Sequence, residues 1–199
     1  MNSENEYWES FYKNHRINQI PSSFAIYVKD KYLDKDKKLL ELGCGNGRDC
    51  LFFASNGINT TAIDMAEDEI TYLNSIDTKN VNFINGDFTQ LSEFKNFDYV
   101  YSRFTFHSIE DKSENLVLSQ LKNILKTGGL FLLEARSTKD EELEKVFGTG
   151  HFRRYLDFEK TIKKIEAQGF YILEKHESRG LAIYKTEDPY LLRIIAKRN

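Results

Sequence analysis

The stretch 39–49, LLELGCGNGRD, constrains the fold more than any other part of the chain. A short apolar run ends in three alternating glycines, Gly43, Gly45 and Gly47, and passes directly into a segment with the pattern of a helix. Glycine has no Cβ atom, so the backbone can turn sharply there and approach a ligand closely. The helix that follows offers unpaired N–H groups and the positive end of its dipole. Together these features predict a site for a ligand with a negatively charged group.

The segments after this turn alternate between strand and helix patterns. Predicted strands cover residues 39–42, 59–63, 81–84, 97–102, 130–133, 170–173 and 190–196. Predicted helices cover residues 48–56, 66–74 and 158–169. Another helix begins at Asp111, where we expect a capping box with Glu114, and ends at Gly128 and Gly129. This alternation predicts an α/β fold, a parallel sheet covered by helices on both faces.

Two helices are predicted before the glycine turn. The first carries an aromatic face that includes Tyr7, Trp8 and Tyr12, and the second runs over residues 22–32 after Pro21. The aromatic helix has two interpretations. It closes over a pocket as a lid, with Tyr7, Trp8 or Tyr12 touching the ligand, or it docks on the sheet as an ordinary amphipathic helix.

Composition narrows the class of protein. The chain has 199 residues and a formal net charge of −3, which argues against nucleic acid or an anionic membrane as a partner. The first residues lack the regions of a signal peptide, and no apolar run reaches the length of a membrane span. Cys44 and Cys50 lie six residues apart across the glycine turn and the helix after it, so a disulfide between them would distort that element. Two cysteines without a nearby pair of histidines also make a poor zinc site. We expect a reduced, cytoplasmic protein without a metal.

The spacing of the glycines indicates which ligand the turn holds. A dinucleotide site has the pattern G-x-G-x-x-G, and Arg48 stands here where the third glycine would be. Asp64, after the second predicted strand, can accept hydrogen bonds from ribose hydroxyls. Asp87, after the third, is placed to meet an adenine amino group. The pattern therefore favours a nucleoside that is not a dinucleotide.

These motifs occur together and in order: Glu41-x-Gly43-x-Gly45-x-Gly47, Asp64, residues 86–88 and residues 98–100. The set resembles the class I S-adenosylmethionine-dependent methyltransferases. The resemblance covers residues 39–199 and implies a doubly wound, seven-stranded, mostly parallel sheet whose last strand is antiparallel. The length of the chain and the absence of repeats and low-complexity linkers predict a single domain over residues 1–199. That domain divides into a helical N-terminal cap (1–38), a cofactor-binding half (39–135) and an acceptor-side half (136–199).

The resemblance assigns roles to residues that match the family's motifs. Gly43, Cys44, Gly45 and Gly47 would give backbone contacts to the methionine part of S-adenosylmethionine. Asp64 would bind the ribose, Met65 would line the adenine, Asp87 and Phe88 would hold the adenine edge, and Ser102 would lie near the sulfonium. Arg48 opposes the helix dipole and needs a partner, for which the cofactor carboxylate, Glu41 and Asp49 are alternatives.

The acceptor side is predicted from residues that follow the fourth and fifth strands. Transfer to a hydroxyl needs a nucleophile in line and help with its proton. His107 is the candidate base, or else a histidine that caps its loop through the backbone. Arg103 is a second candidate catalytic residue. The predicted substrate contacts are Tyr12, Arg136, His151 and Arg154. Several arginines near one pocket favour an anionic acceptor, such as a sugar derivative, a nucleotide-linked compound or a phosphorylated metabolite.

Closer resemblances point to two branches of the family. The glycine turn and the size are similar to the tellurite-resistance and thiopurine-methyltransferase-like members, and residues 101–107 and 150–155 are similar to methyltransferases of bacterial surface-polysaccharide synthesis. A macromolecular acceptor is the alternative, but residues 102–105 carry no N-P-P-Y/F-type motif. A cofactor-binding protein without transferase activity is a further alternative. We expect a monomer or a homodimer that acts on a small molecule.

Overall fold

A computed structural model describes residues 7, 8, 10, 20–141, 143 and 152–199. Its strands form one seven-stranded sheet in the order β3-β2-β1-β4-β5-β7-β6. The strands are β1 (Lys38–Leu42), β2 (Asn59–Asp64), β3 (Val81–Asn85), β4 (Phe97–Arg103), β5 (Leu125–Arg136), β6 (Phe170–Ser178) and β7 (Leu191–Arg198). β7 runs antiparallel to both of its neighbours, and the remaining pairs are parallel. The predicted fold, including its antiparallel last strand, is confirmed.

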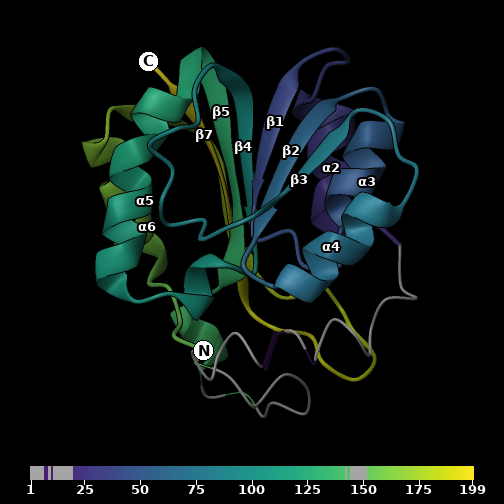
Figure 1. Cartoon of the computed structure of the whole chain (residues 1–199). Coiled ribbons are helices and arrows are strands. Elements are labelled where there is room, and N and C mark those ends of the chain that lie inside the picture. Colours follow the sequence, from purple (N-terminus) through teal and green to yellow (C-terminus); the bar gives the residue numbers. More distant parts are fainter. Residues whose placement is uncertain (1–6, 9, 11–19, 142, 144–151) are drawn as a thin grey trace.

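Helices cover both faces of this sheet (Figure 1). One layer holds α2 (Ser23–Tyr32), α3 (Arg48–Ser55) and α4 (Glu67–Ser75), and the other holds α5 (Asp111–Ile124) and α6 (Phe158–Ala167). The strand order reverses between β1 and β4, so the loops that follow these two strands diverge to opposite sides. Ligands of open α/β sheets bind at this kind of switch point, beside the carboxyl ends of the strands.

The core lies on both sides of the sheet because successive side chains of a strand point to opposite faces. On β1, Leu40 and Leu42 pack into the cluster that contains Leu118 and Ile162 of the α5 and α6 layer. Leu39 packs instead with the α2 and α3 layer. Glu41 shares the face of Leu39 by alternation, and it is buried there. A carboxylate is therefore buried on the α2 and α3 side of the sheet, close to the end of β1.

The start of α2 follows the prediction from Pro21. Ser22 is the N-cap of this helix, and its side chain accepts a hydrogen bond from the Ala25 N–H at 3.0 Å. Of the predicted aromatic helix, Tyr7, Trp8 and Ser10 are helical, and the Tyr7 and Trp8 rings meet edge to face at 5.1 Å. Tyr12 lies outside the described residues, so the lid remains a prediction.

Two local predictions for α5 are wrong. Its N-cap is Glu110, whose side chain makes no capping bond, and Glu114 instead pairs with Arg154 and Lys164. The expected capping box therefore does not form, because Glu114 is drawn to basic side chains distant in sequence. The helix ends at Ile124, and Gly128 and Gly129 lie inside β5. A Cβ atom at Gly129 would lie 2.9 Å from the Asp98 carbonyl oxygen, so close backbone approach explains that glycine.

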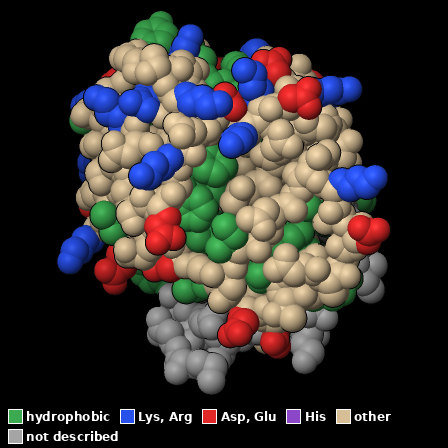
Figure 2. Space-filling view, turned by 45° about the horizontal axis from the view of Figure 1, so that its top comes forward, with side chains coloured by type: hydrophobic (Ala, Val, Ile, Leu, Met, Phe, Trp, Pro, Cys, Tyr) green, Lys and Arg blue, Asp and Glu red, His purple; other side chains and the backbone are tan. Residues whose placement is uncertain are grey.

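The molecular surface is mixed in charge. Figure 2 shows basic side chains spread over the upper part of one face, with acidic side chains among and below them. Hydrophobic side chains reach that surface in a narrow seam near the middle of the view. Among the helices built from described residues, none combines the length and apolar character needed to cross a membrane.

Candidate active site

The glycine turn links β1 to α3, and all three of its glycines adopt left-handed backbone conformations. The φ angles are +72° at Gly43, +52° at Gly45 and +78° at Gly47. A Cβ atom at Gly43 would lie 2.2 Å from Cγ2 of Thr105, and one at Gly47 would lie 2.8 Å from Cδ2 of Leu73. The backbone conformation favours glycine at both positions, and at Gly43 the Thr105 methyl group also leaves no room for a Cβ atom.

Asp64 holds the turn from the end of β2. Its Oδ2 accepts a hydrogen bond from the Gly45 N–H at 2.8 Å, and its Oδ1 accepts one from the Ala66 N–H at 3.0 Å. Burial raises the pKa of Asp64, and the backbone N–H donors oppose that shift. A carboxylate offers about four lone-pair positions, which is more than these backbone donors occupy. Asp64 can therefore shape the turn and still accept a hydrogen bond from a ligand.

The other predicted nucleoside contacts surround this edge of the sheet. Met65 and Asp87 are exposed after β2 and β3, and Asp87 accepts a hydrogen bond from the Thr89 N–H at 2.8 Å. Phe88 lies close to the turn, with one ring carbon 3.8 Å from the point that a Cβ atom on Gly43 would occupy. Cys44 is buried in a hydrophobic cluster with Cys50, so its side chain packs there and the predicted ligand contact of Cys44 is left to its backbone.

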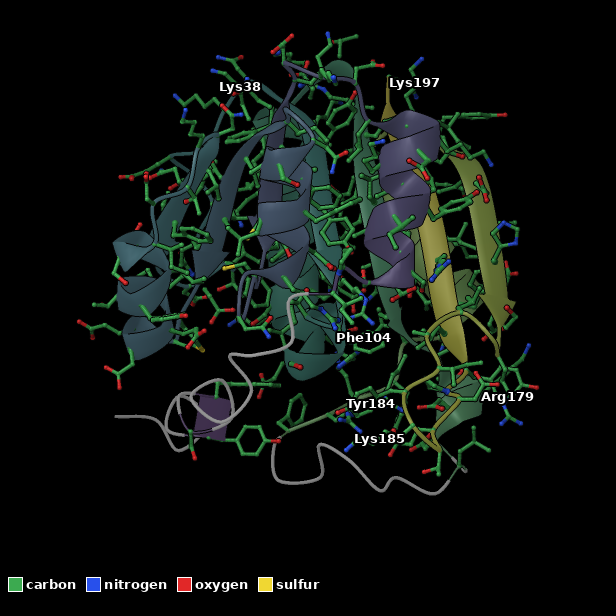
Figure 3. The ribbon with its side chains drawn as sticks, turned by 90° about the vertical axis from the view of Figure 1, so that its right-hand side faces the viewer. Lys38, Phe104, Arg179, Tyr184, Lys185 and Lys197 are labelled. Carbon is green, nitrogen blue, oxygen red and sulfur yellow. The ribbon has the colours of Figure 1, made fainter. Side chains whose placement is uncertain are left out.

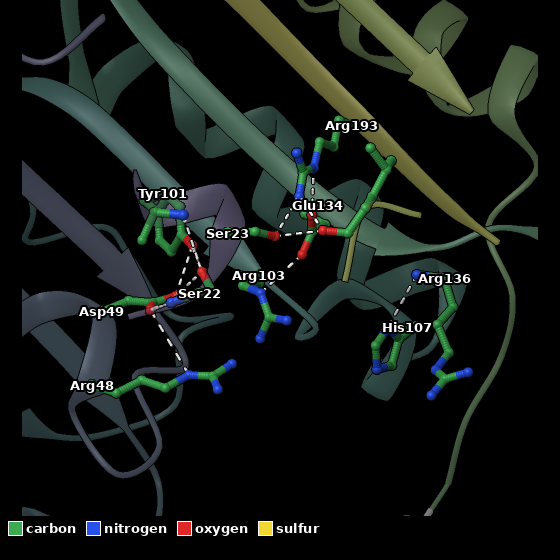
Figure 4. Close-up of polar contacts among 12 residues, drawn as sticks. Ser22, Ser23, Arg48, Asp49, Tyr101, Arg103, His107, Glu134, Arg136 and Arg193 are labelled. Carbon is green, nitrogen blue, oxygen red and sulfur yellow. Dashed lines mark hydrogen bonds and ion pairs between the residues drawn. The ribbon is translucent and has the colours of Figure 1, made fainter. Parts of the chain in front are cut away.

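A buried carboxylate, Asp49, joins the glycine-turn helix to its neighbours. It accepts hydrogen bonds from the Ser22 N–H and the Ser22 hydroxyl, each at 2.7 Å, and from the Tyr101 hydroxyl at 2.8 Å (Figure 4). These bonds tie the start of α2 and the end of β4 to the first turn of α3. Burial raises the pKa of the Tyr101 phenol well above its usual range, and Asp49 adds to that shift. Tyr101 therefore stays protonated and donates.

A second buried carboxylate, Glu134, connects β4, β5 and β7. Its Oε1 lies 2.8 Å from Nε of Arg103 and its Oε2 lies 2.5 Å from Nε of Arg193 (Figure 4). Arg193 also donates to the Ser23 hydroxyl at 3.0 Å and to the Leu181 carbonyl at 2.9 Å. Arg103 is thus held at the end of β4 by a fixed anion, and its orientation depends on residues from three strands.

The residue after Arg103 is in an unusual backbone conformation. Phe104 has φ of +58°, a region that L side chains rarely adopt. Its ring centroid lies 4.1 Å from the guanidinium carbon of Arg103, 5.9 Å from that of Arg136 and 5.3 Å from the His107 ring. Figure 3 places Phe104 at the carboxyl edge of the sheet, at the same end as Tyr184 and Lys185 and opposite Lys38. Outliers of this kind cluster at functional sites.

Arg48 is the first residue of α3 and lies next to the buried carboxylate of Asp49. Of the partners considered for it, Asp49 lies at ion-pair distance, with 3.8 Å between Nε of Arg48 and Oδ1 of Asp49. Burial and the nearby charge of Arg103 lower the pKa of Arg48. Glu41 is buried close by, and its Oε2 has no hydrogen-bond partner in the described structure. Burial raises the pKa of Glu41 well above its usual range, while Arg48 and Arg103 act in the opposite direction.

His107 is buried in the short 3₁₀ helix Phe106–Ser108. Its Nδ1 accepts a hydrogen bond from the Arg136 N–H at 3.4 Å, as the loop-capping alternative predicts. We assign the tautomer from this contact: with Nδ1 as acceptor, the neutral ring carries its proton on Nε2. In this tautomer Nε2 carries the ring proton, so it is able to donate a hydrogen bond and unable to act as the base.

Two of the predicted substrate arginines are engaged by other residues. Arg136 is buried between Asp140 at 2.6 Å and Glu187 at 3.2 Å. Arg154 donates to the Ile109 carbonyl at 2.6 Å and to Glu114. We therefore assign Arg154 to the structure of the acceptor-side half and leave it out of the proposed acceptor site. His151, like Tyr12, lies outside the described residues.

Ser102 is fully buried, and its hydroxyl shares a hydrogen bond with the hydroxyl of Thr105. Thr105 is also the residue whose methyl group faces Gly43, so Ser102 supports the turn through it. Within the described part of the chain, no group of three or more His, Cys, Asp or Glu side chains could hold a metal ion.

Sequence reasoning missed Glu134, Arg193 and the role of Asp49. The available signal was a charged residue inside an apolar strand pattern, as Glu134 is in residues 130–135 and Arg193 in residues 191–196. Because isolated charges are rarely buried, such a residue predicts a buried partner, although not which one.

Comparisons with known proteins agree with this geometry. The family model described as "Methyltransferase domain" matches residues 33–175. Ubiquinone biosynthesis O-methyltransferase of Rickettsia bellii is 26% identical over 191 residues, covering 89% of this chain and 79% of the relative. The probable S-adenosyl-L-methionine-dependent methyltransferase TehB of Haemophilus influenzae is 27% identical over 107 residues, covering 52% of this chain and 37% of the relative.

One solved structure is similar to this chain over nearly its whole length. The 1,6-didemethyltoxoflavin-N1-methyltransferase of Burkholderia thailandensis, solved with 1,6-didemethyltoxoflavin and S-adenosylhomocysteine, superposes with a TM-score of 0.75 at 17% identity. The match covers 98% of this chain and 87% of that chain.

Proposed function

Because this chain belongs to the methyltransferase-domain family, within the class I S-adenosylmethionine-dependent methyltransferases, we propose that it transfers a methyl group to a hydroxyl of a small molecule. The observation that carries the proposal is the cradle made by Asp64 and the glycine turn. Asp64 holds Gly45 from the neighbouring strand, and space for a Cβ atom is missing at Gly43. The cradle lies at the switch point of the sheet, where such folds bind ligands.

The residues present fit S-adenosylmethionine. Asp64 would accept from the ribose hydroxyls with the lone pairs that the backbone leaves unused, and Asp87, Phe88 and Met65 would surround the adenine. The backbone of residues 43–47 would face the methionine part, beside the orphaned buried oxygen of Glu41. The cofactor supplies an electrophilic methyl group on a positively charged sulfur.

The protein's part in such a transfer is to position the acceptor and to manage its proton. We propose that His107 contacts the acceptor. In the assigned tautomer its Nε2–H orients an acceptor oxygen by donating a hydrogen bond to it. Service as a general base needs the other tautomer, which gives up the bond from the Arg136 N–H. The acidity of the acceptor hydroxyl therefore decides which role His107 takes.

The sequence predicts an anionic acceptor, whereas the acceptor proposed here need not carry a negative charge. The arginines that favoured an anion, Arg136 and Arg154, are already paired with carboxylates. We therefore do not require an anionic group on the acceptor. The names of the relatives include a ubiquinone-biosynthesis O-methyltransferase and a didemethyltoxoflavin N1-methyltransferase, so compounds with oxygen or nitrogen acceptors belong in the same screen as sugars and phosphorylated metabolites.

Calorimetry and a labelled-methyl assay test the proposal. We expect the wild type to bind S-adenosylhomocysteine and Asp64→Ala to bind it at least about tenfold more weakly, since a hydrogen bond to a charged group is lost. The screen should find transfer to a small hydroxyl compound that depends on the protein. Absence of binding by the wild type would contradict cofactor use. Binding without transfer to any acceptor would support the non-catalytic alternative.

A further inference from the structure

We propose that the acceptor carries its hydroxyl on an aromatic ring and reacts as the oxyanion, without a general base from the protein. This inference rests on the proposed function and narrows the acceptor to one chemical class, a phenol. His107 then orients the acceptor oxygen by donating a hydrogen bond, and Arg103 contributes to the transfer through its charge.

The tautomer of His107 is the first observation. Its Nδ1 accepts a hydrogen bond from the Arg136 N–H at 3.4 Å, which places the ring proton on Nε2. A base at Nε2 would need the proton on Nδ1, where it would meet the Arg136 N–H. The backbone of Arg136 is fixed, because Arg136 pairs with Leu191 of β7 and its carbonyl accepts a hydrogen bond from the Leu156 N–H at 3.0 Å. The end of β5 therefore holds His107 as a donor.

Carboxylates from the elements around His107 are engaged as well. They come from β5, from the 3₁₀ turn after it, from the loop before β7 and from α5, and each is paired with an arginine. These pairs are Glu134 with Arg103 and Arg193, Asp140 and Glu187 with Arg136, and Glu114 with Arg154. A carboxylate beside an arginine favours its charged form and resists taking up a proton. These four carboxylates are therefore poor bases near neutral pH.

The charge beside His107 favours an anion over a further cation. Arg103 and Arg193 share the single carboxylate of Glu134, so this group of three carries a net positive charge. The guanidinium carbon of Arg103 lies 4.1 Å from the centroid of the Phe104 ring, and the His107 ring lies 5.3 Å from the same centroid. A proton taken up by His107 would add a positive charge near Arg103, whereas an acceptor oxyanion would be stabilised there.

Only an acidic hydroxyl can react without a base. A phenol has a pKa of about 10, whereas an aliphatic hydroxyl, like water, has a pKa of about 16. At pH 8 the ionised fraction of the phenol is therefore about 10⁶-fold larger. The phenol gives its proton to water, and its oxygen forms a bond to the methyl carbon as the carbon–sulfur bond breaks. The electron pair of the broken bond stays on the sulfur, which becomes neutral.

Aromatic side chains at the same edge of the sheet suit a ring acceptor. Phe104 is half-buried, and its ring lies at 51° to the His107 ring. Tyr184 is 47% exposed, and Figure 3 places it at the same end of the sheet as Phe104. Two backbone hydrogen bonds of 2.9 Å join Tyr184 to Glu187, which pairs with Arg136, so the Tyr184 loop is fixed to the residue that holds His107. Aromatic rings pair favourably in offset or edge-to-face arrangements, so these side chains complement a phenol.

Paired acceptors test the inference. We would measure transfer of a labelled methyl group from S-adenosylmethionine to phenols whose ring substituents set the hydroxyl pKa between about 7 and 10, each paired with the matching cyclohexanol. Each cyclohexanol should react at less than about 1% of the rate of its phenol. The midpoint of kcat/KM against pH should follow the pKa of each free phenol. A midpoint that is the same for every acceptor would indicate a base on the protein and overturn the inference.

Variants of His107 separate a donor from a base. Glutamine offers one acceptor and one N–H donor, as the assigned tautomer does, but it cannot take up a proton. His107→Gln should therefore retain kcat/KM within about tenfold, whereas His107→Ala should lose about 10- to 100-fold, the range for a hydrogen bond to a charged group. Loss of a base would cost both variants at least about 100-fold, which would overturn the inference. His176→Gln, the same change at an exposed position of β6, is the matched control and should leave the transfer rate unchanged.

The charge of Arg103 has a separate readout. The pH profile of kcat reports the bound acceptor, so its midpoint should lie below the pKa of the free phenol. Arg103→Gln should raise that midpoint by about one unit, the low end of the effect of a nearby opposite charge. A midpoint that does not move would remove Arg103 from the inference. A cooperative thermal transition shows that each variant is folded.

Two further results separate this inference from the proposed function. Nitrogen-15 resonances of the His107 ring should place the proton on Nε2 in the wild type, and a proton on Nδ1 would overturn the inference. If the wild type does not bind S-adenosylhomocysteine, the proposed function fails. If it binds this compound but methylates only saturated hydroxyls or nitrogen atoms, or neither member of any pair, the phenolic acceptor is wrong while cofactor binding stands.

Discussion

Glu41 is a single residue whose buried carboxylate lowers the stability of the folded protein when it is charged. Burial of its carboxylate disfavours its charge most, nearby Cys50 and Asp49 add to this effect, and Arg48 and Arg103 oppose it. The net effect raises the pKa of Glu41 well above its usual range. A residue kept at such a cost is expected to contribute to binding, since stability alone would favour an uncharged side chain.

We predict that Glu41→Gln stabilises the protein at pH 8 while it weakens cofactor binding. Because the pKa of Glu41 is raised in the folded state, its contribution to stability is complete below the unfolded pKa and is lost as pH rises through the folded pKa. The uncharged variant escapes that loss, and its Tm at pH 8 should rise by about 2–4 °C, as for about 1 kcal/mol in a chain of this size. Thermal unfolding at pH 5 and pH 8 measures this. A variant less stable than the wild type at pH 8 would contradict it.

The glycine turn is the element on which the site depends, and its steric limits can be tested. Gly43→Ala should destabilise the protein by about 2–4 kcal/mol, because the new Cβ atom meets Cγ2 of Thr105 at 2.2 Å and φ is +72°. Thr105→Ser deletes that methyl group, so adding it to Gly43→Ala should recover part of the loss. Urea unfolding of the two single variants and the double variant gives the coupling. Additive effects would show that backbone strain alone excludes alanine.

Other elements show what could be predicted from the sequence. β1, α3 and the turn between them lie within one residue of the predicted bounds, because apolar runs and glycine spacing are local signals. The predicted β5 was too short. α5 ends at Ile124 and β5 begins at Leu125, with no helix-breaking residue between them to mark the boundary. The partners of Arg136 were not predicted, because Asp140 meets it through the 3₁₀ turn that follows β5 and Glu187 reaches it only in the tertiary fold.

Across the whole molecule, α2 connects the site to the far edge of the sheet. At its start, Ser22 bonds to Asp49 beside the glycine turn. Toward its end, Tyr27, Lys31 and Tyr32 donate to the carboxylate of Glu174 on β6, the strand at the end of the sheet order. These donors stabilise the anion by more than its partial burial disfavours it, and the pKa of Glu174 falls to about 2. The position of α2 over the sheet is therefore fixed at both ends by carboxylates.

We predict that Glu174→Gln destabilises the protein by about 1–2 kcal/mol above pH 5, from lost hydrogen bonds on a partly exposed carboxylate. Because the pKa of Glu174 is lowered by folding, its contribution is present above the unfolded pKa and is lost as pH falls through about 2. The difference in unfolding free energy between wild type and variant should therefore shrink between about pH 4.5 and pH 2. Urea unfolding across that range measures it, with Glu166→Gln on the exposed face of α6 as the matched control. A difference that stayed constant down to pH 2 would mean that the carboxylate charge does not hold α2 in place.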